Sequence, residues 1–218
     1  MKRPTLLATA LLACLALTPT WGQEKPAPDP HAGHQGMHPP QAAPDPSSDS
    51  GAQRYFGEIP LVNQDGKTMR LYSDVLKGRT VVIDFMFTSC TGVCPILSRN
   101  FAHIQDWLGD RLGKDVYLVS VSVDPVNDTP AKLKEYAARY KARPGWYFLT
   151  GSKENVDAAL KKLGQYVENR EGHQNLFIIG NEPTGLWKKA LGIADPKELI
   201  PIVASVLDDK GETPAPGR

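Results

Sequence analysis

The feature that most constrains the fold of this 218-residue chain is a buried strand that runs into a helix through a turn holding two cysteines. Residues 81–87 are β-branched, aromatic and otherwise apolar except for one aspartate, the pattern of a strand buried on both faces. Pro95 suits the first turn of a helix, where its missing N–H is not needed. Apolar residues then recur at helical spacing, at Leu97, Phe101, Ile104 and Leu108. The sequence therefore predicts that Cys90 and Cys94 lie on a strand-to-helix turn.

The cysteine pair is open to two chemical uses. Cys90 and Cys94 are an i, i+4 pair, which can join as a disulfide or bind one metal ion together. A structural disulfide is a common use of such a pair in exported proteins. Small and polar neighbours favour an accessible pair, as a reactive or metal-binding site needs: Thr88, Ser89, Thr91 and Gly92. Because Cys94 stands at the start of the helix, we expect the helix dipole to lower its pKa.

Composition and charge limit the choice of partners. The chain has 25 basic and 24 acidic residues, so its formal net charge is +1. This balance gives no basic footprint for nucleic acid, and we expect none to bind. A hydrophobic share of 41% is close to the globular average, and the length allows one ordinary domain with tails.

The N-terminus, residues 1–22, has the pattern of a secretory signal. A basic pair precedes an apolar run from Leu6 to Leu17, and cleavage after Gly22 fits the small residues there. The segment ending at Cys14 also resembles a lipoprotein box, in which Cys14 would be lipidated. An uncleaved membrane anchor is the third alternative, although the run is shorter than the roughly 20 residues of a comfortable span. We expect an exported protein, in the periplasm or at the outer face of the cytoplasmic membrane.

Residues 23–54 are rich in proline, alanine, aspartate and serine and show no hydrophobic periodicity, so a disordered linker is predicted. This stretch holds three of the five histidines of the chain together with a methionine: His31, His34, Met37 and His38. Imidazole and thioether groups suit copper, which makes these four residues a candidate auxiliary metal site. The alternative is a polar linker whose histidines bind nothing.

Residues 55–209 alternate strand and helix patterns, which predicts an α/β domain built from crossover units. A hairpin around the turn 63–67 comes first, and a second hairpin over 175–188 comes late. Further strands are expected over 116–123 and 146–149, with helices that begin after Thr129, Ser152 and Asp195. The last helix is expected to bury Ile200, Val203 and Leu207. Residues 210–218 should form a flexible tail.

Several motifs together resemble the SCO/SenC family, thioredoxin-fold copper proteins that assist assembly of the copper centre of cytochrome c oxidase. The resemblance covers roughly residues 55–207. It is carried by Phe87-Thr-Ser-Cys-Thr-Gly-Val-Cys-Pro95, Val121-Ser-Val-Asp-Pro125, Asp128-Thr-Pro130, Trp146-Tyr-Phe-Leu-Thr-Gly151, and His173 ahead of the strand 176–179. It implies a thioredoxin-like fold with an N-terminal β-hairpin extension. By position it also implies copper ligands at Cys90, Cys94 and His173, and the copper-binding subunit of the oxidase as partner.

Two positions depart from the pattern of that family. It commonly has an aspartate directly before the histidine, where this chain has Gly172, and Pro-Asp between the cysteines, where this chain has Thr91-Gly92. The first departure removes an acid that could orient the histidine. The second leaves both cysteines in place.

The donor set agrees with the resemblance. Two thiolates and an imidazole are soft ligands that suit Cu(I) and can also hold Cu(II). Zinc is the rival metal, but three candidate ligands are too few for a closed structural zinc site, which takes four. Without the resemblance, His173 would be interpreted as a solvated loop histidine.

Three further polar residues have simpler interpretations. His103 lies off the apolar face of its helix and is not assigned to a site. Asp84, in the middle of the buried strand, is interpreted as a hydrogen-bonded core acid rather than a catalytic one. Asp124 ends its strand at the same sheet edge as Cys90, where it caps the strand or supports the ligands.

These features are compatible with two functions of different classes. The first is a metallochaperone that carries copper at Cys90, Cys94 and His173 to an oxidase subunit. The second is a thiol-disulfide reductase in which one cysteine attacks a disulfide and the other resolves it. Such oxidoreductases typically carry a cis-proline before the corresponding strand, whereas this chain has no proline between Gly145 and Pro183, so the chaperone is favoured over an enzyme. A peroxiredoxin-like enzyme is a distant third.

Overall fold

The computed structural model describes residues 50–211. The predicted signal segment with Cys14 and most of the predicted linker lie outside the described residues, as does the tail beyond residue 211. The candidate auxiliary site, made of His31, His34, Met37 and His38, is therefore not described either.

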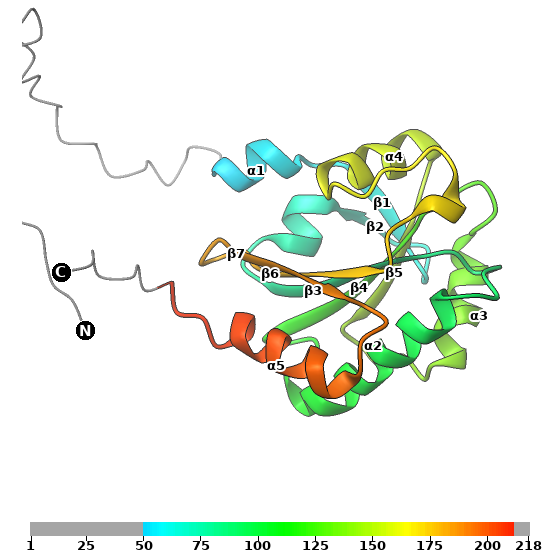
Figure 1. The fold of residues 1–218 in the computed structure, drawn as a ribbon. Coiled ribbons are helices and arrows are strands. Elements are labelled where there is room, and N and C mark those ends of the chain that lie inside the picture. The colour runs from blue at the N-terminus through cyan, green and yellow to red at the C-terminus, as the bar shows by residue number, and fades with distance from the viewer. Residues whose placement is uncertain (1–49, 212–218) are drawn as a thin grey trace, which may run out of the picture. The chain divides into compact units, whose positions relative to one another are not determined.

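A single seven-stranded mixed sheet forms the centre of the described residues, in the order β2-β1-β5-β4-β3-β6-β7 (Figure 1). Its strands are β1 (Pro60–Asn63), β2 (Thr68–Arg70), β3 (Thr80–Met86), β4 (Val116–Ser122), β5 (Trp146–Thr150), β6 (Leu176–Asn181) and β7 (Leu186–Leu191). The three strands β3, β4 and β5 run parallel, whereas β6 and β7 and the β1–β2 hairpin add antiparallel edges. The predicted α/β class is confirmed.

Helices cover both faces of this sheet (Figure 1). The regular helices are α1 (Gly51–Phe56), α2 (Cys94–Leu108), α3 (Pro130–Arg139), α4 (Lys153–Lys162) and α5 (Pro196–Leu207). Shorter helical turns are η1 (Leu71–Leu76), η2 (Gly109–Arg111) and η3 (Arg170–Gly172). One hydrophobic core lies between the sheet and α2, α3 and α5, and a second lies between the sheet and α1, η1 and α4.

Strand β3 is the centre of both cores. All seven of its residues are buried, and alternate side chains enter opposite cores: Val82 and Met86 pack against α2, whereas Ile83 and Phe85 pack on the other face. It pairs in parallel with β4 and antiparallel with β6. The C-terminal end of β3 therefore lies beside the C-terminal end of β4 and near the start of β6.

The predicted helix starts are confirmed at three caps. The side chains of Thr129, Ser152 and Asp195 each accept a hydrogen bond from a backbone N–H in the first turn of α3, α4 and α5. The buried face of α5 differs from the prediction: Leu199, Val203 and Val206 are buried, whereas Ile200 and Leu207 are only partly so. At each end of α5 the buried residue is therefore the one that directly precedes the predicted residue.

Four short helical elements were not predicted: α1, η1, η2 and η3. Helix α1 covers residues 51–56, so the expected end of the linker at residue 54 falls inside a helix. The side chain of Ser50 caps it by accepting a hydrogen bond from the N–H of Gln53. The others are the π-helical turn η1 and the 3-10 turns η2 and η3. No helix within residues 50–211 has the length and apolar character needed to cross a membrane.

Candidate metal centre

The turn between β3 and α2 carries the two cysteines, as predicted. After β3 ends at Met86, the N–H of Cys90 donates to the carbonyl of Phe87 over 3.1 Å, which closes a tight turn. Helix α2 then begins at Cys94 with Pro95 in its first turn. Both cysteines are free thiols in the structure, so no disulfide joins them.

The two thiols differ in exposure and acidity. Cys90 is partly exposed, whereas Cys94 is completely buried. Burial raises the pKa of the Cys94 thiol well above its ordinary value, and the neighbouring Cys90 thiol raises it further. The prediction that the helix dipole lowers the pKa of Cys94 is therefore wrong, because loss of water around the thiolate outweighs the dipole.

His173 lies close to Cys94 but comes from a different loop, the one before β6. It follows η3, and its ring nitrogen Nδ1 lies 2.6 Å from the backbone carbonyl oxygen of Arg170. Because a carbonyl can only accept, Nδ1 carries a proton, and in the neutral ring Nε2 then keeps its lone pair. Nε2 lies 3.9 Å from the Sγ atom of Cys94. The ring also meets Phe87 edge-on, with centroids 5.8 Å apart.

The distance between Cys94 and His173 is close to that of two ligands on one ion. With metal–sulfur and metal–nitrogen bonds of about 2.3 and 2.0 Å, as at zinc sites, the sulfur and nitrogen lie about 3.5–3.7 Å apart. The observed 3.9 Å exceeds this by a few tenths of an ångström. No group of three or more histidine, cysteine, aspartate and glutamate side chains within residues 50–211 is already gathered as a metal site. Cys90, Cys94 and His173 are therefore not gathered into one metal site in this structure.

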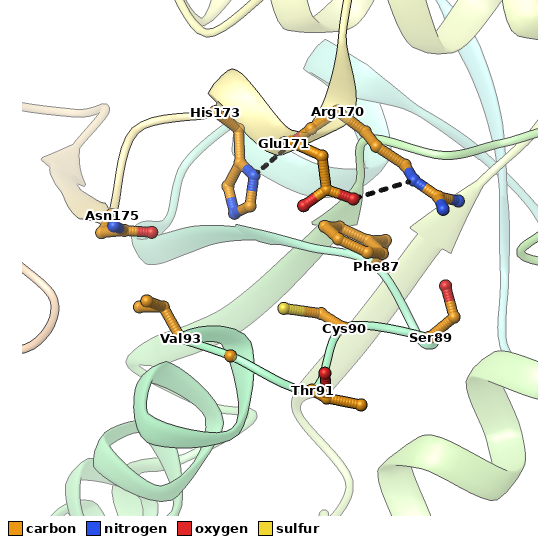
Figure 2. A pocket seen from close by; sticks show the side chains of 10 residues that line it. Phe87, Ser89, Cys90, Thr91, Val93, Arg170, Glu171, His173 and Asn175 are labelled. Carbon is orange, nitrogen blue, oxygen red and sulfur yellow. Dashed lines mark hydrogen bonds and ion pairs between the residues drawn. The ribbon is translucent and has the colours of Figure 1, made fainter.

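An open cavity of about 390 Å³ lies between the cysteine turn and the histidine loop. Figure 2 shows the Cys90 sulfur on one side of this cavity and His173 on the other, with Phe87 between the turn and Arg170. Its lining consists of Phe87, Ser89, Cys90, Thr91, Gly92, Val93, Arg170, Glu171, His173 and Asn175. The cavity gives a solute access to Cys90 and His173, whereas Cys94 is buried and does not line it.

Asp128 ties the cysteine turn to the end of β4. It is 1% exposed, and its carboxylate accepts hydrogen bonds from the hydroxyls of Thr88 and Ser122, both over 2.6 Å, and from the N–H of Thr88 over 3.2 Å. These bonds hold the residues that follow β3 in one position relative to β4. Sequence reasoning used Asp128 only as part of a motif and gave it no role.

Asp124 lies at the same edge and points to the histidine loop. It is buried, its carboxylate accepts from Nδ2 of Asn127, and it forms an ion pair with the guanidinium of Arg170. Asp124, two residues after the end of β4, thus supports the loop before β6. Arg170 was not singled out from the sequence, where it is one charge in a polar loop.

The surroundings of His103 and Asp84 test how the sequence analysis interpreted these two residues. His103 is exposed on α2, in agreement with leaving it out of the site. Asp84 is completely buried, but neither of its carboxyl oxygens has a hydrogen-bond partner among the described residues. The interpretation of Asp84 as a hydrogen-bonded core acid is therefore wrong: no donor meets hydrogen-bond geometry at its carboxyl oxygens, and the hydroxyl of Ser120 on the paired strand β4 offsets the burial only in part. Burial raises the pKa of Asp84 to about 7.

A pair of thiols on a strand-to-helix turn, faced by an imidazole at one edge of a mixed sheet, defines a thioredoxin-like domain with a candidate metal-binding or thiol-exchange site. Comparison with known proteins narrows this class. The SCO1/SenC family model matches residues 47–191. Protein SenC of Rhodobacter capsulatus is 31% identical over 180 residues, which are 78% of this chain and 79% of that protein. This chain belongs to the SCO1/SenC family.

Other relatives match a shorter part of the chain. The SCO1 protein homolog of Bacillus subtilis is 39% identical over 125 residues, which are 54% of this chain and 63% of that protein. The chain spans 50 to 63% of the length of this and two further curated relatives. One of them is described as a putative copper-binding protein from Stutzerimonas stutzeri, 31% identical over 112 residues.

Solved structures confirm the thioredoxin-like fold. BsSco, described as a member of the Sco family of cytochrome c oxidase assembly proteins with a disulfide switch, is 34% identical with a TM-score of 0.57. The match covers 70% of this chain and 92% of BsSco. Arabidopsis thaliana ScoI with copper bound is 25% identical with a TM-score of 0.58, over 70% of this chain and 98% of that one.

Proposed function

We propose that this protein is an exported metallochaperone that binds copper at Cys90, Cys94 and His173 and assists assembly of the copper centre of cytochrome c oxidase. The observation that carries the proposal is the approach of Nε2 of His173, whose Nδ1 is held by the Arg170 carbonyl, to Sγ of Cys94, at 3.9 Å. The copper-binding descriptions of relatives and the oxidase-assembly role of BsSco support it. Copper here is cargo, and the partner is the copper-binding subunit of the oxidase.

The different surroundings of the two thiols suit loading and release of a metal ion. Copper would displace the thiol protons, and its positive charge would offset the burial that keeps the pKa of Cys94 high. Cys90 and His173 line the open cavity, so an incoming or recipient ligand meets them first. Cys94 would then be the last ligand to release the ion. Soft thiolate ligands favour Cu(I), and the imidazole allows Cu(II) as well.

Single ligand substitutions test the site. Cys90→Ser, Cys94→Ser and His173→Ala should each weaken binding of copper to the reduced protein in competition with a chelator. His103→Ala is the matched control, because His103 is exposed on α2 and is assigned no role. Copper binding that survives all three ligand substitutions at the level of the His103 variant would rule out this site.

The alternative function is reduction of a disulfide in the oxidase subunit, and the unequal exposure of the two thiols favours it as a second candidate. The Cys90 thiolate would attack one sulfur of the substrate disulfide, and the other substrate sulfur would leave as a thiol. The Cys94 thiolate would then attack Cys90, which releases the second substrate thiol and leaves this protein oxidised. Two electrons pass from the cysteine pair to the substrate.

His173→Ala separates the two functions, because disulfide exchange needs only the thiols whereas copper transfer also needs the imidazole. For a copper carrier, we expect this variant to fail in oxidase copper loading in cells and still to reduce a model disulfide in vitro. Full oxidase assembly with His173→Ala would mean instead that thiol exchange is the function.

We also propose that His31, His34, Met37 and His38 bind copper as a weaker auxiliary site. Their donor atoms suit copper, and ordering a linker segment would cost free energy, so their affinity should be below that of the cysteine site. Deletion of residues 31–38 should remove this additional copper and leave binding at Cys90 and Cys94 intact. An unchanged copper stoichiometry would show that the segment is only a linker.

Export and the form of membrane attachment are part of the same proposal. A SCO1/SenC family lipoprotein from Bacillus anthracis, 30% identical with a TM-score of 0.59, supports lipidation at Cys14 as one alternative. The mass of the mature N-terminus distinguishes cleavage after Gly22, lipidation at Cys14 and an uncleaved anchor. Cys14→Ser should release the protein from the membrane fraction only in the second case.

A further inference from the structure

We infer that Arg170 is the positioning residue for His173: its side chain fixes the loop, and its carbonyl fixes the tautomer that leaves Nε2 free. The inference rests on the proposed function in one respect, that the free Nε2 binds copper. It is carried by three contacts of one residue, to Asp124, to Phe87 and to His173. These contacts join the ends of two core strands to the histidine.

The Arg170 guanidinium makes two contacts outside its own turn. Nη1 donates to the carboxylate of Asp124, and the guanidinium carbon lies 4.8 Å from the centre of the Phe87 ring, a cation–π contact. The Asp124 carboxylate is itself fixed by two hydrogen bonds from Nδ2 of Asn127, 2.9 and 3.0 Å long. The anchor is therefore a buried and oriented acid rather than a mobile surface charge.

No other residue on this stretch replaces that anchor. Within the described part of the chain, Arg170 is the only residue of 167–172 with a hydrogen bond, ion pair or ring contact to another element. Asn169 accepts from the N–H of Glu171, and Glu171 pairs with Arg170, so both act inside the turn. Gly172, directly before His173, has no side chain with which to orient the ring. Loss of the Arg170 side chain would release the turn on which the histidine stands.

The backbone of Arg170 then sets the chemistry of the ring. Its carbonyl oxygen accepts a hydrogen bond from Nδ1–H of His173 over 2.6 Å, so in the neutral ring the lone pair is on Nε2, which lies 3.9 Å from Sγ of Cys94. A metal-binding histidine commonly donates its other ring N–H to a carbonyl or carboxylate in this way, and such partners govern metal affinity. Figure 2 shows this hydrogen bond and the Arg170 side chain leaving the turn on the other side.

The test compares Arg170→Met with Arg170→Lys in the full chain. Methionine removes the charge and the planar fork, whereas lysine keeps the charge but cannot make the same directed pair. The matched control is Arg70→Met, which breaks an exposed Arg–Asp ion pair of 2.9 Å on the N-terminal hairpin side. The two readouts are the tautomer of His173 in the reduced, copper-free protein, by long-range ¹H–¹⁵N spectra with neutral imidazole, and copper affinity by chelator competition.

Wild type and Arg70→Met should show the Nδ1–H tautomer, and Arg170→Met should show a mixture of the two tautomers. Copper affinity should fall about 10- to 100-fold in Arg170→Met and less in Arg170→Lys. If Arg170→Met keeps the Nδ1–H form and an affinity within about twofold of wild type, the inference is overturned. Should that variant not fold, an unchanged tautomer and affinity in Arg170→Lys overturn it equally. A wild type that binds no copper contradicts the proposed function, and the tautomer comparison still decides the role of Arg170.

Discussion

Cys94 Sγ and His173 Nε2 lie 3.9 Å apart although 79 residues separate them in the sequence. The sheet explains this approach. Strand β3 leads into the cysteine turn, and β6 begins after the histidine loop; the two strands are antiparallel neighbours. The end of one therefore lies beside the start of the other, and the thiol and the imidazole are brought together by strand pairing.

Unequal exposure of the two thiols predicts unequal reactivity. In the reduced protein without metal, iodoacetamide should modify Cys90 at least about tenfold faster than Cys94, because burial keeps Cys94 protonated and out of reach. Peptide mass mapping after short exposure measures the two rates. Equal rates, or faster modification of Cys94, would contradict the burial and the acidity assigned to the pair.

Asp84 should make the domain less stable as the pH rises. Burial raises its pKa from an ordinary 3.8 to about 7, so between these values the folded state holds a proton that the unfolded state has released. The free energy of unfolding should then fall from about pH 4 to about pH 7, by an amount on the order of 3–4 kcal/mol, and level off above. Urea unfolding at pH 5 and pH 8 measures the difference.

Asp84→Asn is the control for that dependence, because asparagine has a similar shape and does not titrate. It should reduce the loss of stability between pH 5 and pH 8 and should be more stable than wild type at pH 8. An identical pH dependence in the variant and in wild type would mean that other groups cause the effect.

The β6–β7 hairpin depends on the absence of a side chain at Gly180. A Cβ atom there would lie 2.2 Å from two ring atoms of Trp187, which packs on Phe56 at 5.5 Å between ring centroids. Gly180→Ala should therefore lower the free energy of unfolding by about 1–3 kcal/mol through overpacking. Gly172→Ala, which meets nothing within 4 Å, should change it by less than about 0.5 kcal/mol. A Gly180 variant as stable as the Gly172 variant would contradict this packing.

Most of the fold was predictable because its signals are local. The buried strand over 81–87 was visible from its apolar run, and the caps at Thr129, Ser152 and Asp195 from residue type and the proline or periodic pattern that follows. The short elements α1 and η1 were missed. Their apolar residues are too few to show a period, and they are helical because Phe56 and Leu76 pack into the second core.

The residues of the candidate site could be predicted from the sequence, but their burial, acidity and supporting contacts could not. Cys90 and Cys94 followed from their position, and His173 from family resemblance alone. The acidity of Cys94 could not be predicted, because it depends on how deeply α2 buries its first residue. The role proposed for Arg170 could not be predicted for a similar reason. It depends on contacts with Asp124 and Phe87, which are distant in sequence.

The most direct test of the central claim is copper stoichiometry as a function of the redox state of the cysteine pair. The full chain with residues 31–38 deleted is titrated with copper after reduction, and again after oxidation of Cys90 and Cys94 to a disulfide. A disulfide removes two of the three proposed ligands. We expect one tightly bound copper ion per reduced chain and none per oxidised chain. Equal copper binding in both states would contradict the assignment of the thiols as ligands.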